Sequence, residues 1–217
     1  MKNEFWIERW QRNEIGFHQE EFNPYLRKYW QYARPGCEVF VPLCGKSRDM
    51  LWLKDKGHPV LGVELSDIAA RSFFEENGLT PEQKRLGNFE CFEADRIRIL
   101  CGDFFDLSSE HLGKTGAVYD RAALVALPRE MRKSYVDHLA DILLPSTEML
   151  LLTFDYPDHE MQGPPFPVSK EEVRELYGSR FEVELLGEMD TLAENPRFLK
   201  RGLTRLSENI FRIVAKD

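Results

Sequence analysis

The sequence predicts an α/β fold: a doubly wound, mostly parallel sheet with helices on both faces. Short apolar segments with β character alternate with amphipathic segments along most of the chain, a pattern typical of parallel sheets. The first strong apolar segment, CEVFVP at 37–42, suits a strand that is buried on both faces. No repeat, low-complexity segment or Gly/Pro/Ser-rich linker divides the 217 residues, so we expect a single domain, 1–217.

Composition excludes several function classes. The net charge is −8 and Lys and Arg form no basic run, which argues against a protein that binds a phosphate backbone. No apolar run approaches the length of a membrane span, and the N-terminal segment is too charged for a signal peptide. The four cysteines show no C-x-x-C spacing, so we expect reduced thiols and no metal site. We therefore expect a cytoplasmic protein that binds neither nucleic acid nor membrane.

The N-terminal half begins with two helices. Trp6 and Trp10 are four residues apart and share one face of a short helix, and a second helix over 24–33 stops before Pro35-Gly36. The strand at 37–42 follows. Ser47 is then expected to cap a helix that Gly57 ends in a left-handed conformation.

A second strand covers 59–64, and Ser66 caps the helix 67–77 that follows it. Residues 79–88 are expected to form a polar loop. Beyond it, 89–103 holds two β-rich runs around Ala94-Asp95, which indicate a hairpin or two short strands.

The C-terminal half begins with a strand and turn at 117–124. A helix after Pro128 places Met131, Tyr135, Leu139 and Ile142 on one stripe. A strongly apolar strand covers 148–156. Ser169 and Glu172 then form a capping box for a helix that Gly178 ends. Two strands, 181–189 and 209–217, are joined by a loop over 191–208, which indicates an antiparallel edge.

The loop PLCGKS after the first strand fits neither of two common phosphate-binding motifs. A P-loop ending at Ser47 needs glycine where Phe40 stands, and the dinucleotide fingerprint needs several glycines where Gly45 stands alone. A ligand without phosphates needs fewer close backbone approaches. S-Adenosylmethionine is such a ligand, and ligands of parallel sheets lie across the carboxyl ends of the strands.

Four further candidate residues lie at or just beyond the ends of predicted strands. Glu64 ends the second strand, where it either accepts from two ribose hydroxyls or is a surface carboxylate beside the Ser66 cap. Phe104 and Phe105 lie where an adenine would contact the sheet, although one of the two is expected in the core. Arg121 either pairs with Asp120 or faces a ligand cleft, where its planar fork would hold an acidic or heteroaromatic substrate.

Several motifs together resemble the thiopurine S-methyltransferase family. They are, in chain order, FWIERW, GFHQ, VPLCGKSRDMLWL, GVELS, GDFFDL, YDRAALVALP and GPPF. The match extends from Trp6 to about Gly202. The resemblance implies a seven-stranded, Rossmann-like class I methyltransferase sheet, whose C-terminal strand we expect at an antiparallel edge. It also implies S-adenosylmethionine as methyl donor, with S-adenosylhomocysteine as product.

The resemblance also assigns site residues. Trp10, Leu43, Gly45 and Glu64 match cofactor positions, and Asp103 and Phe104 match the adenine side. Arg121 matches the arginine beside the methyl-transfer site, where it would contact cofactor and substrate and act in catalysis. Substrate positions fall on Trp6, Phe17 and Arg197. Residues 1–33 would form a helical cover over the site, unless the tryptophan helix is only an amphipathic packing helix.

The implied reaction is methyl transfer to the sulfur of an aromatic or heterocyclic thiol, or to a selenium or tellurium species. An aromatic thiol is largely ionised near neutral pH, so no general base is assigned, and His18 is read as a structural hydrogen-bonding residue. The alternatives are an NAD-linked oxidoreductase and a cofactor-binding protein without catalysis. We expect a monomer that takes a small-molecule thiol.

Overall fold

The structure is a computed structural model that describes residues 3–216. The chain divides into two compact units, of which the first ends at Tyr119 and the second begins at Asp120. Residues 1, 2 and 217, which belong to the predicted cover and the predicted last strand, lie outside the described residues. Within 3–216, no helix has the length and apolar character needed to cross a membrane.

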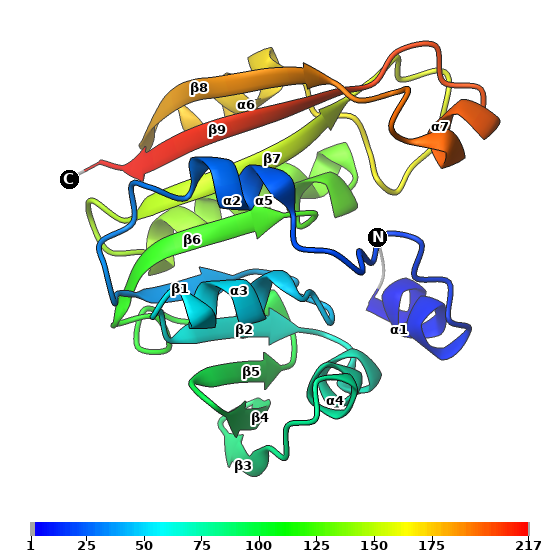
Figure 1. Cartoon of the computed structure of the whole chain (residues 1–217). Helices are drawn as coiled ribbons and strands as arrows, with labels where there is room; N and C mark the ends of the chain where they lie inside the picture. The colour runs from blue at the N-terminus through cyan, green and yellow to red at the C-terminus, as the bar shows by residue number, and fades with distance from the viewer. Residues whose placement is uncertain (1–2, 217) are drawn as a thin grey trace. The chain divides into compact units, whose positions relative to one another are not determined.

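The first unit holds a mainly parallel sheet (Figure 1). Its elements are α1 (Asn3–Gln11), α2 (Pro24–Tyr29), β1 (Glu38–Val41), α3 (Asp49–Asp55), β2 (Val60–Glu64), α4 (Asp67–Glu76), β3 (Glu82–Leu86), β4 (Phe89–Ala94), β5 (Ile97–Cys101), η1 (Phe104–Asp106) and β6 (Thr115–Arg121). The strand order is β3-β4-β5-β2-β1-β6. Strands β1, β2, β5 and β6 are parallel, so β1 and β2 end at the same edge and bring their following loops together.

Local sequence explains most of these elements. All five residues of β2 are buried, as a strand inside a parallel sheet requires. Ser66 caps α4 as predicted, because its hydroxyl accepts from the Ala69 N–H at 3.4 Å. Gly57 ends the helix before β2 with φ +95°, a conformation that favours glycine.

The predicted Ser47 cap is confirmed in part. Helix α3 begins at Asp49 and Arg48 at the cap position makes no side-chain cap bond, but the Ser47 hydroxyl accepts from the Asp49 N–H at 3.3 Å. The Asp49 carboxylate has other partners, since it accepts from the Asn23 N–H at 2.8 Å and from the Tyr119 hydroxyl at 2.9 Å. These bonds hold the start of α3 against α2 and the end of β6, and the helix begins where they are made.

The predicted hairpin at 89–103 is confirmed as β4 and β5, with Asp95 and Arg96 at positive φ in the turn. The prediction of a loop over 79–88 is wrong, because this segment contains β3, which pairs antiparallel with β4. Four of the five residues of β3 are exposed, as on an edge strand, and the segment therefore lacks the apolar alternation that marks a strand.

The second unit holds three more strands and their helices. These elements are η2 (Leu124–Ala126), α5 (Arg129–Ile142), β7 (Glu148–Asp155), α6 (Lys170–Tyr177), β8 (Phe181–Asp190), α7 (Pro196–Lys200) and β9 (Ser207–Ala215). The C-terminal strand β9 is antiparallel, as predicted, but its predicted place at the edge is wrong. It lies between β7 and β8 and pairs with both, so β8 is the edge strand of this unit (Figure 1).

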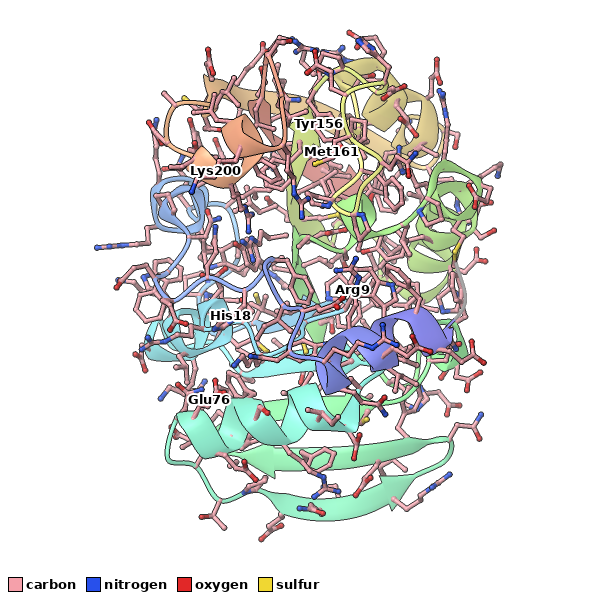
Figure 2. The ribbon with its side chains drawn as sticks, turned by 90° about the vertical axis from the view of Figure 1, so that its right-hand side faces the viewer. Arg9, His18, Glu76, Tyr156, Met161 and Lys200 are labelled. Atoms are coloured by element: carbon pink, nitrogen blue, oxygen red, sulfur yellow. The ribbon has the colours of Figure 1, made fainter. Side chains whose placement is uncertain are left out.

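Two local predictions in this unit also need correction. The Ser169 hydroxyl caps α6 by accepting from the Glu172 N–H at 3.2 Å, but the Glu172 carboxylate pairs with Arg132 at 2.7 Å. The predicted loop 191–208 contains α7, whose Phe198 is buried with Tyr156. Figure 2 shows Tyr156 on the segment that follows β7 and Lys200 on α7.

Candidate functional site

Glu64, the last residue of β2, is the best-defined member of the site. Its side chain is only 6% exposed. One carboxylate oxygen, Oε2, accepts from the Gly45 N–H at 2.8 Å, and Oε1 accepts from the Ser66 N–H at 2.8 Å. Burial raises the pKa of the Glu64 carboxyl, and these backbone N–H bonds partly oppose the increase. The reading of Glu64 as a surface carboxylate is therefore wrong.

The loop after β1 turns sharply at this carboxylate. Leu43 and Gly45 have φ of +45° and +53°, and only glycine adopts such values without strain. The Cys44 N–H donates to the Val63 carbonyl at 2.9 Å, which fixes the loop against the end of β2. A Cβ at Gly45 would lie 3.2 Å from a ring carbon of Trp10, so the indole packs directly on the glycine backbone.

Helix α1 and the segment after it carry an aromatic cluster. The ring centroids of Trp6 and Trp10 lie 5.8 and 5.6 Å from that of Phe17, both in edge contacts. Figure 2 shows Arg9 on α1 and His18 on the following segment, and the Arg9 guanidinium stacks on Phe5 at 4.7 Å. The structure thus brings the predicted residues Trp6, Trp10 and Phe17 together, with Trp10 on the Gly45 loop.

The segment after β5 holds the predicted adenine-side residues. Asp103 caps η1 through Oδ1, which accepts from the Phe105 N–H at 3.0 Å, and its Oδ2 accepts from the Asn3 amide at 2.9 Å. Phe104 is buried and Phe105 is 39% exposed, which confirms that one of the two belongs to the core. Sequence reasoning missed Asn3, whose amide joins α1 to Asp103.

We expect residues 3–17 to lose protection from hydrogen exchange when the cofactor site is empty and to gain it when cofactor binds. A cover must open to admit ligands and then close against water. Amide exchange with and without S-adenosylhomocysteine measures this directly, with the buried strand β2 as internal reference. Equal protection in both states would favour the amphipathic packing helix.

Two predicted residues, Arg121 and Arg197, lie in the second unit. Burial lowers the pKa of the Arg197 guanidinium, and the positive charges of Arg121 and Arg201 lower it further. Burial raises the pKa of Glu208, and the positive charges of Arg121 and Arg197 partly oppose the increase. Sequence reasoning missed Glu208; its only signal is a carboxylate near the start of strand β9.

The Asp120 carboxylate has partners in the following turn and on α5. It is fully buried and accepts from the Tyr135 hydroxyl at 2.6 Å and from the Ala123 and Leu124 N–H groups at 3.2 and 3.3 Å. Among residues 3–216, no three His, Cys, Asp or Glu side chains are grouped as a metal site.

Sequence comparison decides the family. The model of the family described as thiopurine S-methyltransferase matches residues 1–216. The chain belongs to the thiopurine S-methyltransferase family. A thiopurine S-methyltransferase of Nitrosospira multiformis is 56% identical over 218 residues, which span 100% of this chain and 99% of that protein. One of Pseudomonas fluorescens is 46% identical over the full length of both chains.

Solved structures agree on the fold. An S-adenosylmethionine-dependent methyltransferase of Anabaena variabilis has a TM-score of 0.67 at 14% identity, covering 99% of this chain and 95% of that one. A 1,6-didemethyltoxoflavin-N1-methyltransferase of Burkholderia thailandensis, with bound S-adenosylhomocysteine, has a TM-score of 0.64 at 14% identity, covering 99% and 87%. The predicted class I methyltransferase fold and the thiopurine S-methyltransferase family are confirmed, and the oxidoreductase alternative is not supported. The predicted number of seven strands is wrong, since residues 3–216 hold six strands in the first unit and three in the second.

Proposed function

We propose that this member of the thiopurine S-methyltransferase family transfers a methyl group from S-adenosylmethionine to the sulfur of an aromatic or heterocyclic thiol. The observation that carries the proposal is the buried Glu64 carboxylate at the end of β2, bonded to the Gly45 loop. An acid at this strand end is the group that accepts from ribose hydroxyls in nucleotide-binding sheets.

The residues fit this cofactor. Each carboxylate oxygen has two acceptor positions, and each Glu64 oxygen makes one of the hydrogen bonds to Gly45 and Ser66, so acceptor capacity remains for a diol. The loop has a single glycine, which suits the phosphate-free methionine end of S-adenosylmethionine better than a pyrophosphate. Even a methyl group at Gly45 would crowd the Trp10 ring.

When bound, S-adenosylmethionine supplies an electrophilic methyl group on a sulfonium. We assign cofactor binding to one set of residues: Trp10, Leu43, Gly45, Glu64, Asp103, Phe104 and Arg121. Trp6, Phe17, Arg121 and Arg197 are assigned to the acceptor. The arginine charges favour the thiolate form of the acceptor, and Arg121 is the residue to which we assign a catalytic role. The aromatic cover, residues 1–33, excludes water.

The finer features of the proposal are the acceptor class, the domain organisation and the assembly. Selenium or tellurium species belong to the acceptor range, since they share the soft nucleophilic character of sulfur. We propose that both units act as one methyltransferase domain, 1–217, in a cytoplasmic monomer that binds neither nucleic acid nor membrane. Light scattering on the purified protein measures the assembly.

We expect the protein to bind S-adenosylmethionine and S-adenosylhomocysteine in calorimetric titrations and to bind no NAD. Methyl transfer to an aryl thiol, followed with a labelled methyl donor, then tests catalysis. Binding of NAD without S-adenosylmethionine would overturn the cofactor assignment. Tight S-adenosylmethionine binding with no transfer to any thiol, selenium or tellurium acceptor would favour a cofactor-binding protein without catalysis.

A further inference from the structure

The turn that follows Arg121 has an unfavourable backbone conformation. Ala122 has φ +78°, a left-handed value that residues with a side chain rarely adopt. Such a conformation persists only when surrounding contacts hold it. We call residues 120–124 the Arg121 turn, because Arg121 is the last residue of β6 and directly precedes Ala122.

The Asp120 carboxylate supplies these contacts. Its Oδ1 accepts from the Ala123 and Leu124 N–H groups, at 3.2 and 3.3 Å, which closes the turn on the far side of Ala122. Its Oδ2 accepts from the Tyr135 hydroxyl of α5 at 2.6 Å. The carboxylate therefore joins both sides of the turn to a helix of the second unit.

The chain beyond the turn is also fixed. Ala123 and Leu124 are fully buried, and the Val125 carbonyl accepts from the Phe166 N–H at 2.7 Å. Because β6 precedes the turn and these contacts follow it, the position of the Arg121 backbone depends on the conformation of Ala122. The Asp120 carboxylate is the side chain that holds that conformation.

We propose that Asp120 is a positioning residue for methyl transfer: its carboxylate, held by Tyr135, fixes the turn that presents Arg121 to the acceptor. The proposal rests on the acceptor role proposed above for Arg121. Asp120 itself is fully buried beneath the turn and needs no contact with either substrate.

The negative charge of Asp120 matters because hydrogen bonds to a charged acceptor are about twice as strong as neutral ones. Burial raises the pKa of Asp120 to about 6, against the hydrogen bonds from Tyr135, Leu124 and Ala123. Burial also raises the pKa of Tyr135 on α5 and Tyr177 on α6 well above the usual value, so both stay neutral.

The charged residues that adjoin Asp120 and Tyr135 in the sequence are Arg121 and Arg132, which lies three residues before Tyr135 on α5 and is paired with Glu172 at 2.7 Å. His138 lies three residues after Tyr135 on the same helix. Asp120 is thus the carboxyl of the turn that changes charge near pH 6, and below that pH its bonds to the turn weaken.

The raised pKa of Asp120 means that its negative charge strengthens the turn but does not add to the stability of the fold. The folded-state pKa of Asp120 lies above the ordinary value of 3.8, so the folded protein binds this proton more tightly than the unfolded chain. Stability from this group is therefore greatest below the unfolded pKa and falls as pH rises to about 6. Asp120→Asn should leave the melting temperature at neutral pH unchanged or higher while it weakens the turn.

The test compares Asp120→Asn and Tyr135→Phe with Tyr177→Phe as a matched control, since the Tyr177 hydroxyl makes no hydrogen bond within residues 3–216. The acceptor is an aryl thiol with electron-withdrawing groups, ionised over the whole pH range used. At neutral pH we expect Asp120→Asn to lower kcat/KM for this thiol about tenfold. Its affinity for S-adenosylmethionine should stay unchanged, and its Ala123 and Leu124 amides should exchange faster.

The pH profiles sharpen the test. Wild-type kcat/KM should fall below about pH 6 toward the Asp120→Asn value, and the Asp120→Asn profile should be flat. Tyr135→Phe should move the fall to higher pH, because the lost hydrogen bond had lowered the Asp120 pKa. Tyr177→Phe should behave as wild type.

The proposal would be overturned if Asp120→Asn had the same kcat/KM and the same amide protection as the wild type. It would also be overturned if the melting temperature of the variant fell far enough for unfolding to explain the lost activity. If wild type transfers no methyl group to any acceptor, the proposed function is wrong. Amide exchange of Ala123 and Leu124 then decides by itself whether Asp120 holds the turn.

Discussion

Glu64→Gln is expected to weaken S-adenosylmethionine binding about tenfold or more, because a charged acceptor contributes roughly 1.5–3 kcal/mol per hydrogen bond. The structure adds a second cost. Both carboxylate oxygens already accept backbone N–H groups, from Gly45 and Ser66. A glutamine places its NH₂ against one of these donors, so one bond is lost and the Gly45 loop is released.

Calorimetric titration with S-adenosylhomocysteine measures the effect, and thermal melting shows whether the fold survives. Glu76→Gln is the matched control, since this carboxylate lies at the end of α4 (Figure 2), is half exposed and pairs with Lys46 at 2.7 Å. The control should bind as wild type. An unchanged dissociation constant in folded Glu64→Gln would remove Glu64 from the cofactor site and leave it a loop-holding residue.

Arg121→Ala is expected to lower kcat/KM for an aryl thiol roughly ten- to a hundredfold, through loss of a charge-assisted contact made to the acceptor. Cofactor affinity should stay nearly unchanged. Arg121→Lys should restore only part of the activity, because it keeps the charge and loses the planar fork.

Steady-state kinetics, cofactor titration and melting on the same Arg121 variants separate the two interpretations of this residue. A purely structural arginine would lower the melting temperature and impair cofactor and acceptor functions together. Arg174→Ala is a useful control, since Arg174 is an exposed arginine on α6 of the same unit and pairs with Glu171. Normal turnover in Arg121→Ala would exclude Arg121 from the reaction.

The predictable parts of the fold are those in which local pattern and tertiary role agree. Strand β2 is apolar along its whole length because it is buried on both faces, and the carboxylate that ends it stands out for the same reason. Gly45 was recognisable because a turn with positive φ favours glycine. These two features carry the prediction of a cofactor site at the end of β2.

Features set by distant contacts could not be predicted. The exposed strand β3 has no apolar alternation, and α7 is a five-residue helix, too short for a helical period to show. The place of β9 between β7 and β8 depends on pairing across the chain, while the composition of β8 and β9 is compatible with either order.

Some site residues were hidden for the same reason. Asn3 reaches Asp103 across 100 positions of sequence. The partners of Asp120 come from the following turn and from α5, and the sequence alone leaves open whether Arg121 pairs with Asp120 or faces a ligand cleft. Polar residues of ordinary type gain these roles only through the tertiary fold.

The place of β9 has a consequence for how the protein is made. While a ribosome synthesises the chain, β7 and β8 emerge before the strand that joins them, and each then has an edge with unpaired backbone groups. The hydrophobic strand β7 is exposed in this way until residues up to Ala215 have left the exit tunnel. Nascent chains at this stage are prone to aggregate and suited to bind chaperones, so the assembly of this unit waits for β9.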